Sequence, residues 1–409
     1  MLIGGVRTVV RWGVAGLATA QAGVIATLMI ADRRRRRSRQ HVAFPTVPPQ
    51  TMPADETEVT VYTKGRDLYD DMIAAIDAAE HTVLLETYIW KADRTGQRFK
   101  RAVTAAAERG VAVYLVYDWF ANLVVPQKFF NFDPRLNVLR HRPWTGLRRF
   151  PVRAPGLNHR KVLVVDGAIG FLGGYNIGSE YATRWRDTHM RLVGPAVADL
   201  ENVFVDYWNQ TRSKNHTTLA QPDQRQWDSP ITLARNVPSL GVYPIRYMYL
   251  EAIDRARERI WLTHAYLIPD DDLVFALVEA VERGVDVRII VPAESNHVVA
   301  DWLSRVSYHA LLSRGVRLFL YQNAMVHAKT ATIDGVWSTI GTANIDRLSL
   351  VGNYEVNAEV LSADIAAMME GIFTMDLGNC RELTLEEWEQ RPLAAKVSEG
   401  IIAPLRPLL

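Results

Sequence analysis

The 409-residue sequence is poor in cysteine, in lysine and in long apolar runs. A single thiol, Cys380, excludes an intramolecular disulfide and a cysteine-rich zinc site, and is compatible with a reducing compartment. There are eight lysines against 39 arginines. Only residues 12–31 form an uncharged run of 20 residues, so no bundle of membrane helices is expected.

The one uncharged run predicts a membrane anchor over residues 1–40. Twenty residues at a rise of about 1.5 Å match a hydrocarbon core of about 30 Å. Five consecutive arginines (33–37) follow the run, so the positive-inside rule predicts a single pass through the cell membrane with the catalytic body on the cytoplasmic side. A cleaved signal peptide and a helix lying on or re-entering the bilayer are the alternatives.

The net charge of +2 conceals an asymmetry between the N-terminal segment and the body. Residues 1–40 contain eight arginines and one acid, which leaves 39 basic and 44 acidic residues in the rest of the chain. A body of that sign binds nucleic acids poorly, so no nucleic-acid partner is expected. Four prolines within residues 41–58 predict a linker between anchor and body.

The body of the chain is an internal repeat. Residues 74–90 are echoed by 251–267, and residues 106–118 by 280–292. Each half contains a helical pattern followed by a β-branched strand, which favours an α/β fold. We expect two similar lobes, each a mixed β-sheet flanked by helices, with the active site at their interface. The predicted helices span 98–109 and 271–283, the strands 111–117 and 285–291, and the lobes 59–221 and 240–409.

Each half carries the motif H-x-K-x4-D, and the shared register continues beyond it. Glycine recurs at the fourteenth place after each histidine, asparagine at the seventeenth and a carboxylate at the twenty-eighth. One such motif would usually be a polar strand face, but two in register indicate a site. The residues are His159, Lys161, Asp166, Gly173, Asn176 and Asp187 in the first half, and His327, Lys329, Asp334, Gly341, Asn344 and Glu355 in the second.

The spacing predicts a β-hairpin in each half. Residues at i and i+2 of a strand share a face, so His159 and Lys161 point the same way. Asp-Gly between apolar runs is a strong hairpin signal, and the return strand carries Gly173 and Asn176 back toward the histidine. We expect the glycine to let backbone N–H groups approach a phosphate and the asparagine amide to donate to it. Asp166 belongs to the motif, although its place in the turn favours a structural role.

Two imidazoles and two ammonium groups predict phosphodiester chemistry without metal or cofactor. One histidine attacks phosphorus, and the other protonates the leaving oxygen and later deprotonates the acceptor. The lysines and asparagines stabilise charge on the non-bridging oxygens, and the carboxylates orient the imidazoles. A metal site of histidine and aspartate is the alternative, but lysine is no ordinary metal ligand.

The duplicated motif, followed in each half by G-x-x-N, resembles the phospholipase D superfamily. Residues 158–181, 185–197 and 327–350 are similar to bacterial cardiolipin synthases of the phospholipase D type, and the likeness runs from about Val59 to Leu409. It implies two α/β lobes that share one active site. It further implies His159 as nucleophile, His327 as general acid/base, Lys161, Lys329, Asn176 and Asn344 as phosphate ligands, and Asp187 and Glu355 as orienting groups.

The implied reaction joins two phosphatidylglycerols into cardiolipin and releases glycerol, through a covalent phosphohistidine. A hydrolytic phospholipase D that releases phosphatidic acid is the first alternative, and a nuclease-like phosphodiesterase is the second. Phospholipids and the membrane are the expected partners, and the sequence does not predict an oligomeric state. Many such synthases begin with two membrane helices, whereas only one is predicted here.

Two further features remain open at the level of sequence. The segment 119–153 interleaves aromatic and basic residues, which suits either a membrane interface or a packed loop. His189 and His264 have no counterpart at the repeat spacing and are expected to be packing or pocket-lining residues.

Overall fold

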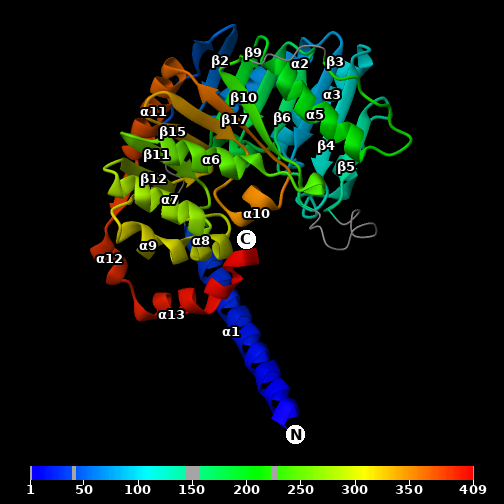
Figure 1. The fold of residues 1–409 in the computed structure, drawn as a ribbon. Coiled ribbons are helices and arrows are strands. Elements are labelled where there is room, and N and C mark those ends of the chain that lie inside the picture. The colour runs from blue at the N-terminus through cyan, green and yellow to red at the C-terminus, as the bar shows by residue number, and fades with distance from the viewer. Residues whose placement is uncertain (1, 39–42, 144–155, 223–227, 409) are drawn as a thin grey trace.

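The computed structural model describes residues 2–38, 43–143, 156–222 and 228–408, and two eight-stranded mixed sheets dominate it (Figure 1). The predicted fold class, two similar lobes of mixed sheet flanked by helices, is confirmed. In sheet order, the strands of the first lobe are β1 (Gln50–Ala54), β2 (Thr57–Tyr62), β9 (His189–Val193), β7 (Ile169–Gly173), β6 (Val162–Val165), β3 (Thr82–Thr87), β4 (Ala112–Asp118) and β5 (Asn137–His141).

The second lobe repeats the order from β2 to β5, and its additional strand, β18, lies at the edge opposite to that of β1 in the first lobe. β3, β4 and β5 are parallel in the first lobe, as are β11, β12 and β13 in the second, and the remaining pairs in both sheets are antiparallel. Its strands, in sheet order, are β10 (Ile231–Asn236), β17 (Glu355–Leu361), β16 (Trp337–Gly341), β15 (Lys329–Ile333), β11 (Arg259–His264), β12 (Asp286–Pro292), β13 (Arg317–Tyr321) and β18 (Cys380–Leu383).

Helices cover the sheets and connect the parallel strands. The first lobe has α2 (Gly65–Asp77), α3 (Arg94–Glu108), α4 (Ser179–Thr183) and α5 (Val197–Thr211). The second has α6 (Pro244–Arg255), α7 (Asp271–Glu282), α8 (Val298–Ser304), α9 (Tyr308–Leu312), α10 (Arg347–Val351), α11 (Ala363–Leu377), α12 (Leu385–Glu389) and α13 (Leu393–Ile402).

Local sequence explains the helices and hairpins that frame the site. α3 begins four residues before the predicted start because the Asp93 carboxylate accepts from the Gly96 N–H at 3.0 Å, an N-cap. Both predicted hairpins form, β6–β7 and β15–β16. Asp166 (φ 52°) and Gly167 (φ 65°) occupy the left-handed region that such a turn requires, as do the corresponding residues of the second lobe.

The two lobes share one apolar core. Buried residues of β2, β6, β9 and α5 pack in one cluster with buried residues of β16, β17 and α11. Val203 and Phe204 of α5 and Met368 and Ile372 of α11 belong to this cluster. The lobes are therefore packed against each other through sheet faces and helices, and the interface can hold a site in fixed geometry.

The structure corrects two predicted boundaries. Residues 50–54, expected in a linker over 41–58, form β1, which pairs antiparallel with β2 at the edge of the first sheet. Pro53 within this strand reads as a loop signal, but an edge strand tolerates proline because its outer N–H groups need no partner. The second sheet includes β10 from Ile231, so the second lobe begins before the predicted residue 240.

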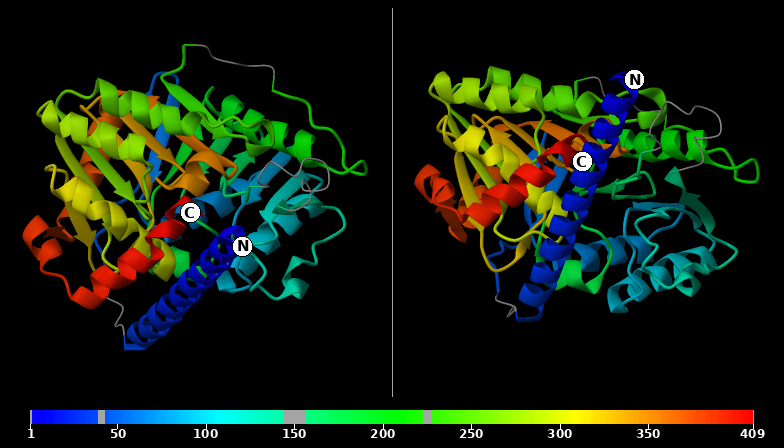
Figure 2. Two further views of the ribbon diagram at one scale, coloured as in Figure 1. Left: turned by 60° about the horizontal axis from the view of Figure 1, so that its bottom comes forward. Right: turned by 90° about the horizontal axis from the view of Figure 1, so that it is seen from below.

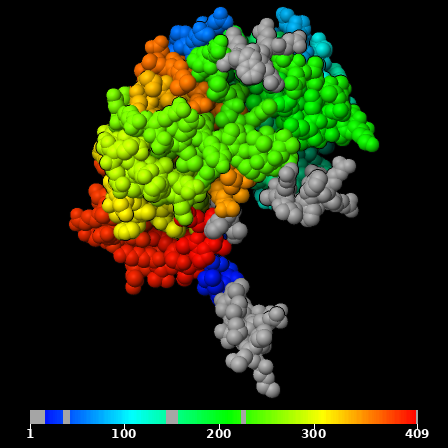
Figure 3. All heavy atoms as spheres, in the orientation of Figure 1, coloured from blue at the N-terminus to red at the C-terminus, as the bar shows by residue number. Residues whose placement is uncertain are grey.

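The N-terminal segment forms one long helix, α1 (Leu2–Ser38), which runs beside the C-terminal helix α13 (Figure 2). Gln21 Nε2 donates to the Ile401 carbonyl at 3.1 Å, and Val24 and Ile25 pack on Ile402. In the face drawn in Figure 3, the C-terminal residues form the underside of the second lobe next to α1. Among the described residues, no helix combines the length and apolar character needed to cross a bilayer. The predicted single pass through the membrane is therefore not confirmed.

The aromatic half of segment 119–153 packs on the first lobe. Phe130 stacks on Tyr117 with ring centroids 4.6 Å apart, and Phe129 and Phe132 contact Trp90. For these residues the packed-loop alternative holds. Residues 144–155, which include Trp144, Arg148, Arg149, Phe150 and Arg153, lie outside the described residues.

Candidate active site

The backbone brings the two motifs together across the lobe interface. The His159 N–H donates to the Tyr354 carbonyl at 3.0 Å, and the His327 N–H donates to the Arg186 carbonyl at 2.7 Å. Short parallel pairings flank both bonds, Asn158 with Tyr354 and Val326 with Arg186. Each motif is therefore fixed to the segment that precedes the carboxylate of the other lobe.

Each histidine pairs with the carboxylate of the opposite lobe. His159 Nδ1 lies 3.0 Å from both carboxylate oxygens of Glu355, and His327 Nδ1 lies 2.6 Å from Asp187 Oδ2. An Nδ1–H that donates to a carboxylate fixes the tautomer and leaves Nε2 for chemistry. The four side chains are buried. Each histidine–carboxylate pair needs residues from both lobes.

The surroundings keep both imidazoles neutral. Burial, followed by the ammonium groups of Lys161 and Lys329, lowers the pKa of each histidine well below its usual value. A neutral imidazole with a free Nε2 is the nucleophilic form. Burial raises the pKa of Glu355 to about 7 and that of Asp187 to about 6, so both carboxylates titrate near neutral pH.

The two motif lysines lie behind the histidines. Each Nζ donates to the backbone carbonyl of the histidine two residues before it. Burial lowers the pKa of Lys161 to about 7 and that of Lys329 to about 8, and the nearby carboxylates oppose the shift. Two such ammonium groups form a positive site that suits a phosphate anion.

Both motif asparagines, Asn176 and Asn344, are buried. Asn176 Oδ1 accepts from the Ile89 N–H at 3.1 Å, which turns the amide nitrogen away from that backbone. Asn344 Oδ1 has no hydrogen-bond partner among the described residues.

The structure gives Gly173 and Gly341 a packing role, and their predicted role in phosphate binding stays a prediction. A Cβ on Gly173 would lie 2.5 Å from the Cα of His189, and one on Gly341 would lie 2.1 Å from Asn357 Oδ1. These glycines make room for the neighbouring strands β9 and β17.

The grouping of Asp166 and Asp334 with the catalytic residues is also corrected. The Asp166 carboxylate accepts from the N–H groups of residues 80, 81 and 82 at 2.6 to 2.8 Å. Asp334 accepts from those of residues 257, 258 and 259 at 2.7 to 2.9 Å. Both therefore fasten the hairpin to the start of β3 or β11, at the strand end away from the histidines.

Sequence reasoning missed the residues that seat the two carboxylates. A Cβ on Gly174 would lie 2.1 Å from Asp187 Oδ1, so only glycine leaves room for this carboxylate. At the same register in the second lobe, Thr342 Oγ1 donates to Glu355 at 2.5 Å. The repeat register was the available signal, since both residues stand fifteen places after the histidine.

Aromatic rings border the histidines. The rings of Tyr88 and His159 are 4.6 Å apart, and those of Trp185 and His327 are 4.9 Å apart. His189 and His264 are buried farther back, and neither has a hydrogen-bond partner on its ring among the described residues. Burial lowers the pKa of each to about 3, so both stay neutral.

Two α/β lobes that share one site, each supplying one histidine, one lysine and one carboxylate, have the architecture of the phospholipase D superfamily. Comparison with known proteins narrows this class. Residues 72–208 and 249–377 match the family described as cardiolipin synthase, phospholipase-D-like domain. The chain therefore belongs to this family of cardiolipin-synthase-like phosphatidyltransferases.

Individual relatives agree with this assignment. Cardiolipin synthase 2 of Staphylococcus epidermidis is 32% identical over 371 residues, which cover 87% of this chain and 75% of that protein. The major cardiolipin synthase of Bacillus subtilis is 33% identical over 368 residues, covering 87% and 76%. The crystal structure of phosphatidylserine synthase from Haemophilus influenzae Rd KW20 has the same fold, with a TM-score of 0.68, 14% identity, and coverage of 89% and 97%.

Proposed function

We propose that this protein moves a phosphatidyl group from one phosphatidylglycerol to the hydroxyl of a second, forming cardiolipin and glycerol through a phosphohistidine on His159. The observation that carries this proposal is the crossed arrangement of the site. Two neutral imidazoles, each held by a buried carboxylate at 3.0 Å or 2.6 Å, leave two Nε2 atoms for a nucleophile and an acid/base. Residue roles follow the family resemblance.

In the first half-reaction His159 Nε2 attacks phosphorus and the phosphorus–oxygen bond to glycerol breaks. The leaving oxygen needs a proton from His327. Burial and the two lysines lower the pKa of His327 in the empty site, and a bound phosphate anion acts in the opposite direction. Substrate binding therefore loads His327 with the proton that it gives to glycerol.

In the second half-reaction the acceptor hydroxyl enters the place that glycerol has left. Neutral His327 removes its proton, the oxygen attacks phosphorus, and the bond from phosphorus to His159 breaks. Lys161 and Lys329 hold the non-bridging oxygens in both steps. Water would compete for the same intermediate, so a transferase must present a bound lipid alcohol and exclude water.

One experiment tests this proposal directly. Purified protein with phosphatidylglycerol vesicles should yield cardiolipin and glycerol in equal amounts, measured by mass spectrometry of the lipid extract and by a glycerol assay. Phosphatidic acid as the main product at high phosphatidylglycerol content would make the protein a hydrolytic phospholipase D. Denaturation at alkaline pH after reaction with labelled lipid should preserve an acid-labile phosphate that maps to His159, and an adduct on His327 would reverse the two roles.

A further inference from the structure

The proposed reaction fixes where glycerol must leave. Displacement at phosphorus runs in line, so the leaving oxygen lies opposite the attacking His159 and within reach of His327. Glycerol therefore departs on the His327 side. By microscopic reversibility the acceptor hydroxyl enters on that side too.

A cavity of about 70 Å³ lies on the His327 side. Its walls include Asp32 of α1, Trp185 of the short strand β8 (Trp185–Arg186), the loop 294–296 after β12, and residues 323–325 at the start of β14 (Met325–Val326). The rings of Trp185 and His327 are 4.9 Å apart. The cavity is thus one side chain away from the acid/base.

A second contact links the cavity to His327. The Tyr266 hydroxyl donates at 2.5 Å to Oδ1 of Asn296, which lines the cavity. The Tyr266 ring lies 6.3 Å from that of His327. Asn296 and Trp185 therefore lie between the cavity and His327, the proposed proton donor to glycerol.

The lining suits a small neutral polyol. A water molecule needs about 10–15 Å³ of such space, so the cavity has room for a group of several heavy atoms. Carboxylates, amides and a hydroxyl supply acceptors and donors for adjacent alcohol groups. The carboxylates of Asp32, Glu180 and Glu294 and the guanidinium of Arg184 are among the groups that line the cavity.

The first lobe fills the corresponding space with protein. The Leu157 N–H donates to Asn353 Oδ1 at 3.1 Å. Gly156 packs so closely that an added Cβ would lie 2.1 Å from the Gly352 carbonyl oxygen. The two lobes therefore differ in the packing next to their histidines, to which the proposed mechanism gives different roles.

We propose that this cavity binds the glycerol headgroup of phosphatidylglycerol, as leaving group and as acceptor, and that Glu294 and Asn296 set the preference for it. The inference rests on the proposed function and goes beyond it by naming the residues that select the alcohol. It also gives α1 a second role, since Asp32 closes the cavity.

The test is a competition between alcohols for the phosphohistidine. The full-length protein is given phosphatidylglycerol vesicles with ethanol, and the ratio of cardiolipin to phosphatidylethanol is measured by mass spectrometry. Asn296→Ala and Glu294→Gln should each lower this ratio about tenfold, by the loss of one or two hydrogen bonds. With phosphatidyl-p-nitrophenol as donor, whose leaving group has no diol, both variants should release nitrophenolate at the wild-type rate.

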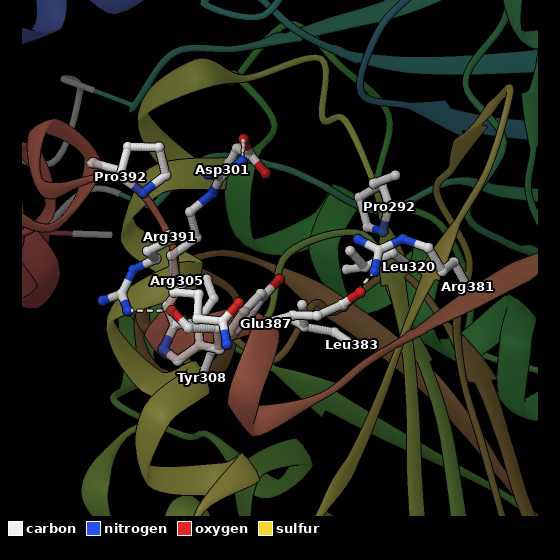
Figure 4. Close-up of a pocket in the computed structure, with 14 residues that line it drawn as sticks. Pro292, Asp301, Arg305, Tyr308, Leu320, Arg381, Leu383, Glu387, Arg391 and Pro392 are labelled. Atoms are coloured by element: carbon white, nitrogen blue, oxygen red, sulfur yellow. Dashed lines mark hydrogen bonds and ion pairs between the residues drawn. The ribbon is translucent and has the colours of Figure 1, made fainter.

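A larger cavity of about 630 Å³ on the other side of the same loop supplies a matched control (Figure 4). Its arginines are paired with carboxylates, Arg305 with Asp301 at 3.1 Å and Arg381 with Glu387 at 2.5 Å. Glu387→Gln removes a carboxylate as Glu294→Gln does, but outside the proposed subsite. It should leave the product ratio unchanged.

The outcomes separate this inference from the proposed function. If the wild type forms no cardiolipin, the proposed function fails. If the wild type forms cardiolipin and both variants keep its product ratio, the subsite is wrong and the function stands. If the wild type prefers an ethanolamine headgroup to glycerol and the variants lose this preference, the assignment of glycerol as the ligand is wrong. Should a variant fail to fold, the wild-type protein provides the test. Added glycerol should cleave cardiolipin to phosphatidylglycerol, and half-maximal cleavage should need about tenfold less glycerol than 1-propanol.

Discussion

The two halves of the active site are alike in their reacting groups and unlike in what surrounds them. Each half has a histidine, a lysine two residues on, and a carboxylate from the other lobe. Around them, Gly174 of one half corresponds to Thr342 of the other, and a polar cavity to packed backbone. The difference teaches that the duplication supplies two equivalent sets of reacting groups, whereas the residues around them differ. We attribute the different proposed roles of the two histidines to these neighbours.

The buried ion pairs behind the histidines show the same pattern. In the first lobe Arg160 pairs with Glu86 at 2.9 Å, within the lobe. Near the second histidine Arg186 pairs with Asp376 at 2.7 Å, and this pair joins β8 to α11 across the interface. Each histidine thus has a buried arginine nearby. The ion pair of Arg186 crosses the interface, whereas Arg160 reaches the other lobe through the ring of Tyr354, 5.9 Å away.

The largest effect is expected when one histidine is removed at a time, which tests whether the two histidines have different roles. His159→Ala and His327→Ala should each lower cardiolipin formation by at least about 10³-fold, and the double variant should be no worse, since the two act as a unit. With phosphatidyl-p-nitrophenol as the donor, the two single variants should differ in nitrophenolate release. The nitrophenolate needs no proton, so His327→Ala should still release one equivalent in a burst, and His159→Ala should not. A burst in His159→Ala alone would exchange the two roles.

This comparison also shows what could be predicted from sequence. Hairpins follow from local period and turn chemistry, so both hairpins were predicted correctly, but His159, Lys161 and His327 lie just before the strands on which they were expected. The crossing of Glu355 to His159 could not be predicted, because it arises from pairing between lobes. β1 was missed because Pro53 hides an edge strand, and the close packing of Gly173 on His189 could not be predicted because the two residues belong to different strands.

The carboxylates allow a milder test of the same comparison. Asp187→Asn and Glu355→Gln should each lower turnover about 10²- to 10⁴-fold, because an amide no longer fixes the reactive tautomer. Since Glu355 holds His159, Glu355→Gln should slow the nitrophenolate burst, whereas Asp187→Asn should spare it. Stopped-flow absorbance measures both. Equal slowing of the burst in both variants would mean that the two halves share one role.

The pH dependence should report both halves together. Glu355 and Asp187 must be ionised to accept from the histidines, so kcat/KM should fall as pH drops through about 7 to about 6. Lys161 and Lys329 must be protonated, so it should fall again as pH rises through about 7 to about 8. The expected profile is a narrow bell near neutral pH, with about a tenfold loss per pH unit where one group titrates and about a hundredfold loss per unit below about pH 6 and above about pH 8, where both do. Rates that stay level from pH 5 to 9 would contradict these assignments.

The smallest expected effect on activity concerns the motif aspartates, which the structure places outside the chemistry. Asp166→Ala and Asp334→Ala each leave three backbone N–H groups without their acceptor, next to solvent. The free energy of unfolding should fall by about 1–3 kcal/mol, measured by urea titration, while kcat of the folded protein stays within about twofold. Asp166→Asn is the matched control, because asparagine keeps one acceptor oxygen and tolerates the left-handed turn. It should lose less stability than Asp166→Ala. Loss of turnover in either alanine variant, at wild-type stability, would return the aspartate to the reaction and restore the whole H-x-K-x4-D motif as catalytic.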